Sequence, residues 1–472
     1  MKPQTDDPSC LMIVACSFLA VAVTLGRGVG TARAQNGLIL DQQLDANNRG
    51  YTVLRVWGSH YEMGYAQASL LGDYIVQGVN ETEAYLNQFG MYDTVRGIMA
   101  TAVWMPTGIE DEFGAVVDCL ATTHPQENID ELDLKVACTA GEWLYGCRSH
   151  TCWGRYVAEP TRTLSTRRLD FQTLYASMNH HVLCARDPDD GSPRWVNMGW
   201  AGIVTVATGV NEFGTVASLH DYYCNTDFAA GRMPRMVACR YALTLATDPD
   251  ISTHLGSVYA ELQNYEIMTG SFINYYVPEG HGGVMTCNPY SAEPDPDFYH
   301  LRVPQEVWHH GEAMITTNAW TDGTYTPMDE NFGADAYYDD ETPKTLESHW
   351  DLLAEAGDGL HQLSIAYRGR EDMTIWGDGR LDDGMGGRTP RLEYEWGALF
   401  GTASQLGDMN CDGDVTTNDI SHFVQALIDW DGYVADHDGD PYPTCDPWLA
   451  DINDDDAVDG LDIQAFVDAL VP

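Results

Sequence analysis

A cysteine followed fifteen residues later by an arginine is the pair in this sequence best suited to covalent chemistry. Residues 151–170 alternate in polarity on either side of a Glu159–Pro160 turn signal, which predicts a β-hairpin. With the turn centred there, Cys152 faces Arg167. A thiol is a good nucleophile only as the thiolate, and a neighbouring guanidinium favours that charged form. The stretch therefore predicts Cys152 as a nucleophile activated by Arg167.

Asp170 completes an Arg-x-x-Asp pattern with Arg167. Strand alternation puts positions 167 and 170 on opposite faces, so both reach one site only if the strand ends or bulges there. Two plainer interpretations stay open. Cys152 could be structural, bonded to Cys147, and Arg167 with Asp170 could be an ordinary surface ion pair, which contributes little.

The cysteine with its Arg-x-x-Asp resembles the N-terminal-nucleophile cysteine hydrolases, most closely the penicillin acyltransferase family. Three further segments are similar to that family. They are the Gly-x-x-x-Glu-x-Gly of residues 58–64, the Gly-Val-Asn-Glu-Phe-Gly of residues 209–214, and Thr317-Asn318. All four segments occur in the order in which that family has them, so together they support the resemblance better than any one of them does alone.

The resemblance implies a four-layer αββα fold of the α+β class and cleavage between Thr151 and Cys152. The freed α-amino group, which titrates near pH 8, would then be the base for its own thiol. The resemblance also gives roles to three more residues: Arg167 holds the thiolate, Asp170 orients the new amino terminus, and Asn318 donates to the oxyanion. The implied reaction is hydrolysis or transfer of an acyl group from a linear small-molecule amide, with no catalytic cofactor.

One position departs from the family pattern. Asp221 stands where relatives have an asparagine that helps to bind the oxyanion, and His220 precedes it. An ionised carboxylate would repel the oxyanion, so a backbone amide, His220 or a group elsewhere must supply the second donor. His220 could equally be a core or surface histidine.

The last 65 residues contain an internal repeat with an offset of 43. Two twelve-residue loops place oxygen ligands at the positions of an EF-hand calcium loop. The predicted ligands are Asp408, Asn410, Asp412, Asp414 and Asp419 in the first loop, and Asp451, Asn453, Asp455, Ala457 (through its carbonyl) and Asp462 in the second. Asp456 replaces the usual glycine, so we expect a weaker second site.

Each loop leads into a helical apolar stripe, Ile-x-x-Phe-Val-x-Ala-Leu, and a duplicated loop and helix resembles a type I dockerin module. The resemblance implies a cohesin-type protein partner. Loop positions 10 and 11 differ between the halves, Thr417-Asn418 against Gly460-Leu461, so the halves should not bind one partner interchangeably. We also expect a Cys411–Cys445 disulfide. The alternative is a merely acidic, solvated tail.

Composition and targeting signals agree with an exported protein. An apolar run before Ala32-Arg33-Ala34 predicts a secretory signal peptide, with lipid attachment at Cys16 as the alternative. No later apolar run is long enough to span a membrane. The formal charge of −47 opposes binding to nucleic acid or anionic membranes.

The predicted organisation has four segments: a signal peptide (1–34), a mainly helical pro-segment that becomes the small subunit (35–151), the hydrolase domain (152–405) and the calcium-dependent docking module (406–472). Within the hydrolase domain we expect strands over 196–208 and 215–222. Two other functions stay open. One is a phospholipase-B-like ester hydrolase on the same scaffold, and the other is an inactive binding protein with a decayed site.

Overall fold

The computed structural model describes most of the chain. The described residues are 36–139, 147–169, 180–221, 230–245, 257–258, 260–268, 312–316, 334–340, 342–354, 360–381, 388–400, 407–410, 415–436, 447–452 and 457–470, together with the strand backbone of 33–34, 271–277, 281–287 and 299–302.

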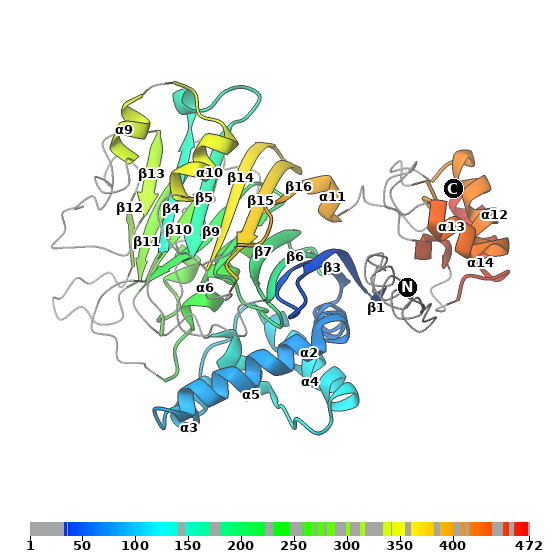
Figure 1. Cartoon of the computed structure of the whole chain (residues 1–472), viewed down its shortest axis with the longest axis horizontal. Coiled ribbons are helices and arrows are strands. Elements are labelled where there is room, and N and C mark those ends of the chain that lie inside the picture. The colour runs from blue at the N-terminus through cyan, green and yellow to red at the C-terminus, as the bar shows by residue number, and fades with distance from the viewer. Residues whose placement is uncertain are drawn as a thin grey trace, which may run out of the picture.

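Two β-sheets form the centre of the molecule (Figure 1). Sheet A runs in the order β1 (Arg33–Ala34), β2 (Gly37–Leu44), β3 (Gly50–Gly58), β6 (His180–Pro188), β7 (Trp195–Trp200), β8 (Thr208–Asn211), β9 (Val216–Asp221), β10 (Ser271–Val277), β11 (His281–Cys287) and β12 (Tyr299–Arg302). Sheet B runs β13 (Ala313–Thr316), β4 (Cys147–Trp153), β5 (Thr163–Leu169), β14 (His361–Gly369), β15 (Asp372–Gly379) and β16 (Leu392–Glu395). Neighbouring strands are antiparallel except β3 and β6, which are parallel.

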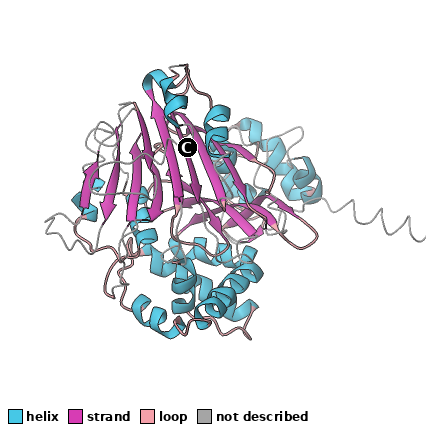
Figure 2. Ribbon diagram, turned by 60° about the vertical axis from the view of Figure 1, so that its left-hand side comes forward, coloured by secondary structure: helices cyan, strands magenta, loops and turns pink. Residues whose placement is uncertain are grey.

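Helices cover the outer faces of both sheets (Figure 2). An apolar core joins sheet A to α2 (His60–Asn87), α3 (Tyr92–Met99), α4 (Gly108–Thr123), α5 (Glu131–Cys138) and α6 (Arg235–Thr244). A second core, with Val53, Met198, Leu363 and Ile375, lies between the sheets. On the outer face of sheet B pack α9 (Ala334–Asp339) and α10 (Leu346–Ala354). The short helix α11 (Trp396–Phe400) belongs to the core between the sheets. This mixed α+β arrangement is compatible with the αββα fold that the resemblance implies.

The segment similar to the family's Gly-x-x-x-Glu-x-Gly opening is the start of α2. Ser59 and Glu62 form a capping box, in which Ser59 N–H donates to Glu62 Oε2 at 2.7 Å and Glu62 N–H donates to Ser59 Oγ at 3.3 Å. Gly64 lets α4 approach closely, because a Cβ there would come within 2.5 Å of the Glu112 carbonyl oxygen. These residues therefore position α2 against α4.

The predicted pro-segment is mainly helical and also contributes β2 and β3 to sheet A, whereas β1 lies within residues 1–34. One prediction of secondary structure needs correction. The strand expected over 196–208 is two strands, β7 and β8, because the carbonyls of Ile203 and Val204 accept hydrogen bonds from Arg186 (3.0 Å) and Arg240 instead of from a strand. The strand expected over 215–222 is observed as β9, after a turn closed by the Asn211 side chain.

A buried ion cluster fastens the pro-segment helices to the rest of sheet A. Glu112 on α4 accepts hydrogen bonds from Arg186 on β6 (2.6 Å) and Arg240 on α6 (2.5 Å), and all three side chains are fully buried. Burial alone raises the pKa of Glu112, but Arg240 and Arg186 more than offset this and hold its pKa far below the ordinary value. The cluster therefore contains an ionised carboxylate between two cations.

The C-terminal residues form a small helical unit of their own. It contains α12 (Ile420–Ile428), α13 (Trp430–Asp436), α14 (Asp462–Leu470) and the short 3₁₀ turns η5 (Thr417–Asp419) and η6 (Pro447–Ala450). Phe423 of α12 and Phe466 of α14 stack with ring centroids 4.0 Å apart. These are equivalent positions of the two repeats, so the duplicated apolar stripes pack against each other.

Candidate active site

The observed pairing of β4 with β5 differs from the predicted hairpin. Cys152 lies opposite Leu164, and Arg167 lies opposite Ser149. After Trp153 the chain makes a 3₁₀ turn, η2 (Gly154–Tyr156), in which Gly154 has φ +57° and a Cβ would come within 2.7 Å of the Glu312 carboxylate. This longer connection shifts the register by three residues. The prediction that Cys152 faces Arg167 is therefore wrong.

An odd shift in register also exchanges the two faces of a strand. Cys152 points to the outer face of sheet B, where it packs with Tyr338 of α9. Arg167 points to the inner face, toward sheet A. Cys147, Ser149 and Arg167 share that inner face, because each is an even number of residues along a paired strand from the others.

Arg167 binds the thiol at the start of β4. Its Nη2 lies 3.0 Å from Cys147 Sγ and donates to the Leu219 carbonyl at 2.6 Å, and its Nη1 donates to Thr208 Oγ1. The guanidinium is thus held by β8 and β9 of sheet A while it contacts a cysteine of sheet B. This is the cation–thiol pair that the sequence predicted, but with a different cysteine.

A hydrogen-bonded group of two serines and a histidine joins the sheets beside this pair. Ser149 Oγ lies 3.0 Å from Ser218 Oγ and 2.8 Å from His220 Nε2. Burial and Arg167 lower the pKa of His220 far below its ordinary value, against an opposing effect of the Cys147 backbone. His220 is therefore a neutral imidazole next to Cys147.

Cys152 has surroundings that suit a structural residue. It is 0% exposed, and burial raises the pKa of its thiol to about 12, although a hydrogen bond with Tyr338 lowers it. Tyr338 in turn bonds His349 at 3.1 Å. A thiol with such a pKa is almost wholly protonated at neutral pH.

The other predicted site residues are only partly described. Asp170 and Asn318 lie outside the described residues, as do Cys411 and Cys445. Asp221 ends β9 in backbone only. β13 ends at Thr316, which lies opposite Ser149.

Cys147 is the residue that sequence reasoning missed. The sequence suggests Cys147 only as a disulfide partner of Cys152, but both cysteines are thiols and face opposite sides of β4. One signal could have found it. In a hairpin whose paired residue numbers have an even sum, Arg167 lies on the same face as the odd-numbered residues of the partner strand, which include Cys147 and not Cys152. The Trp153-Gly154 step marks a connection that is longer than a tight turn.

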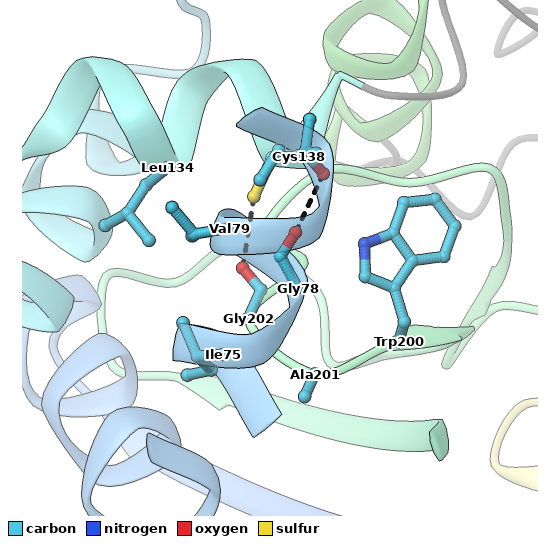
Figure 3. Close-up of a pocket in the computed structure, with 10 residues that line it drawn as sticks. Ile75, Gly78, Val79, Leu134, Cys138, Trp200, Ala201 and Gly202 are labelled. Carbon is cyan, nitrogen blue, oxygen red and sulfur yellow. Dashed lines mark hydrogen bonds between the residues drawn. The ribbon is translucent and has the colours of Figure 1, made fainter. Parts of the chain in front are cut away.

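A small pocket lies away from this pair, between α2, α5 and the loop after β7 (Figure 3). Its lining is largely apolar and includes Ile75, Val79, Leu134 and Trp200. The Cys138 thiol donates to the Gly202 carbonyl at 3.1 Å, and burial raises its pKa to about 12. The pocket therefore offers no activated nucleophile.

The calcium loops are described at their ends. Asp408 and Asp419 of the first loop and Asp451 and Asp462 of the second are buried carboxylates. Asp419 accepts backbone hydrogen bonds from Asn410 (3.0 Å) and Thr416 (2.7 Å), which fold the loop around it. Asp462 likewise accepts a backbone hydrogen bond from Asp459 at 2.9 Å. Calcium ligation stays a prediction, since no group of three or more acidic, histidine or cysteine side chains among the described residues could hold a metal ion. Asn410 is described and half-buried, whereas residues 411–414 and 453–456, which hold the predicted ligands Asp412, Asp414, Asn453 and Asp455, lie outside the described residues.

No protein-family model and no curated protein matches the chain. Among solved structures, it is similar to the Caenorhabditis elegans ortholog of N-acylethanolamine-hydrolyzing acid amidase, with a TM-score of 0.35 and 11% identity over 47% of this chain and 92% of that one. It is also similar to a mutant of conjugated bile acid hydrolase from Clostridium perfringens, with a TM-score of 0.34 and 9% identity over 53% of this chain and 92% of that one. Similarity at this level does not determine an activity, which has to be argued from the site itself.

Within the described residues, no helix is both long and apolar enough to cross a membrane.

Proposed function

We propose that this chain is a self-processing cysteine amidohydrolase or acyltransferase whose nucleophile is Cys147. The observation that carries the proposal is the 3.0 Å contact between Arg167 Nη2 and Cys147 Sγ at the first residue of β4. A guanidinium at this distance favours the thiolate. Cleavage before Cys147 would then leave the small subunit ending at Gly146, with the hydrolase domain beginning at the nucleophile.

The mechanism uses groups of the new chain terminus. The α-amine of Cys147 takes the thiol proton, and the thiolate attacks the carbonyl carbon of a linear amide. The same proton passes to the departing amine as the C–N bond breaks, which leaves a thioester. Water, or a second amine in the transferase reaction, then attacks the thioester and releases the acyl group. Arg167 holds the sulfur, and Asn318 and Asp170 remain the proposed oxyanion donor and amine-orienting residue.

Mass spectrometry of the secreted protein tests this proposal. We expect a fragment beginning at Cys147, lost in Cys147→Ala and retained in Cys152→Ala. A fragment beginning at Cys152 would restore the original prediction, and an intact chain with full activity would refute self-processing altogether. Release of acyl groups from lipid micelles, without activity on N-acyl amino acids, would instead favour the ester hydrolase.

We also propose that residues 1–34 direct export and that residues 406–472 bind two calcium ions. The four buried aspartates at the loop ends support the calcium sites. Calcium titration of the full chain should show two sites, and Asp451→Ala should remove the weaker one and leave the other. A flat titration of the wild type would eliminate both.

The partner proposed for this unit is a cohesin-type protein domain. Both helices that follow the loops expose matching apolar side chains: Ile420 is 42% and Ile463 47% exposed, and Val424 and Val467 are each 45% exposed. Such a pair of apolar surfaces on a small unit is typical of a protein-binding face. We expect one pair of Asp substitutions, at 420 and 424 or at 463 and 467, to abolish binding to a cohesin panel, while the other pair does not. If neither pair of substitutions abolishes binding, these helices are excluded as the binding face.

A further inference from the structure

Self-cleavage poses a problem that the mature mechanism does not solve. Before cleavage the nitrogen of Cys147 belongs to the Gly146–Cys147 peptide bond, so it is an amide and has no basic lone pair. The thiol must nevertheless lose its proton before the sulfur can attack the Gly146 carbonyl. A different base is therefore required for the first reaction of the precursor, and the following argument rests on the proposed function of Cys147.

His220 lies against the strand that carries this thiol, one inward-facing residue away from it. Its Nε2 lies 2.8 Å from Ser149 Oγ, and Ser149 is the next inward-facing residue after Cys147 on β4. The ring also interacts with the Cys147 backbone. The imidazole is thus fixed by one hydroxyl against the strand that carries the thiol.

The surrounding charge keeps this histidine in its basic form. His220 is fully buried, and the groups that face it are Arg167 of β5, His150 and Ser149 of β4 and Ser218 of its own strand. None of these groups is acidic, so none of them stabilises an imidazolium before the reaction. Once the thiol gives up its proton, a thiolate and an imidazolium form together beside Arg167, and each charge stabilises the other.

We propose that His220 is the proton acceptor that starts self-cleavage of the precursor. His220 takes the Cys147 thiol proton, and the sulfur bonds to the carbonyl carbon of Gly146. The imidazolium returns the proton to the Cys147 nitrogen as the C–N bond breaks, which gives a thioester and a free α-amine. Water then hydrolyses the thioester, leaving a Gly146 carboxylate and restoring the thiol. In the mature enzyme the α-amine takes over as base.

The matched control for this residue is His361. It is also fully buried on an inner face, and burial followed by Arg167 lowers its pKa as well. It lies on β14 and makes no hydrogen bond to β4 among the described residues. We therefore compare His220→Gln with His361→Gln in the full chain, and measure the first-order appearance of the Cys147 terminus after a pulse of cell-free synthesis.

We expect His220→Gln to slow processing by about a hundredfold or more, and His361→Gln to change it by less than about threefold. The pH profile separates a proton acceptor from a merely structural residue. Without the base, the residual rate should rise tenfold per pH unit, whereas a packing defect lowers the rate equally at every pH. Hydroxylamine, which cleaves thioesters, should not restore processing in His220→Gln because the thioester does not form.

Processing of His220→Gln at the wild-type rate would overturn the inference and leave the proposed function intact, since the wild type still starts at Cys147. A wild-type fragment that begins elsewhere would refute the proposed function itself. If His220→Gln does not fold, as judged by limited proteolysis, Ser149→Ala decides. This variant releases the imidazole and should slow processing by about tenfold, and an unchanged rate would overturn the inference.

Discussion

The two cysteines of β4 have different surroundings because they face different layers. Cys147 meets a guanidinium at the sheet–sheet interface, whereas Cys152 lies in an apolar cluster with Tyr156, Leu164 and Tyr338 under α9. Burial is the main cause of the high pKa of Cys152, and its hydrogen-bond partner is the neutral Tyr338 hydroxyl. The face of the strand, rather than the residue type, decides which thiol meets a cation.

Cys152→Ala should therefore keep both processing and turnover. Loss of a buried sulfur leaves a small cavity, so we expect the free energy of unfolding to fall by about 1 kcal/mol, as for similar small truncations. Urea unfolding with an activity assay on the same sample measures both effects. A variant that folds but has no activity would return Cys152 to the active site.

Arg167→Met should slow alkylation of the Cys147 thiol in the processed protein by about tenfold or more at neutral pH, because the thiolate loses the cation that lies 3.0 Å from its sulfur. The measurement is the rate of alkylation by iodoacetamide. Arg168→Met is the matched control. Arg168 is the next residue of β5 but points to the outer face, where it donates to the Leu353 carbonyl at 2.7 Å. An equal slowing in both variants would contradict the assignment of Arg167.

At the scale of elements, α4 is held by charge as well as by apolar packing. Glu112 connects it to β6 and α6, and His60 of α2 contacts the same carboxylate at 2.9 Å. Replacing this buried carboxylate with a neutral group should lower the free energy of unfolding strongly, because both arginines would then remain buried without a compensating charge.

Glu112→Gln should lower the free energy of unfolding by about 3–5 kcal/mol. Glu110→Gln on the same helix, where the carboxylate is largely exposed and pairs with Lys135, should cost less than about 1 kcal/mol. The folded pKa of Glu112 is depressed, so its contribution is complete above the ordinary carboxyl pKa of about 4.3 and is lost as pH falls below it. Unfolding curves at pH 7 and pH 3 should therefore differ less for Glu112→Gln than for the wild type.

At the scale of the whole molecule, the proposed cleavage divides a structure that is continuous in space. Strands β1, β2 and β3 precede the cleavage point and β6 follows it, yet β3 and β6 pair in parallel over nine residues, from Gly50↔His180 to Gly58↔Pro188. The helices α2, α4 and α5 share one apolar core with sheet A. The two products are therefore parts of one fold.

The processed chains should stay together under native conditions. Size-exclusion chromatography should give a single peak with the mass of the full mature chain, and two bands should appear only on a denaturing gel. Separation should need the urea concentration that unfolds the protein, because the strand ladder and the Glu112 cluster break only then. Elution of the small chain by itself in buffer would contradict this arrangement.

Several features could be predicted from the sequence alone, because they depend on interactions between neighbouring residues. The turn at residues 211–214 and the two repeats with their helical stripes each depend on side chains within a few residues of one another. The sequence also selects Arg167, through its Arg-x-x-Asp pattern with Asp170. Such interactions join residues that are close together in the sequence, so a local pattern predicts them.

Tertiary structure decided which cysteine meets that arginine. Side chains alternate faces with a period of two, so the three-residue shift introduced by η2 moves Cys152 to the far side of the sheet and leaves Cys147 beside Arg167. It also decided that the strands of the pro-segment join sheet A and that His220 of β9 meets Ser149 of β4. These contacts join residues dozens of positions apart, and their energies depend on register and packing between layers, which no local pattern specifies.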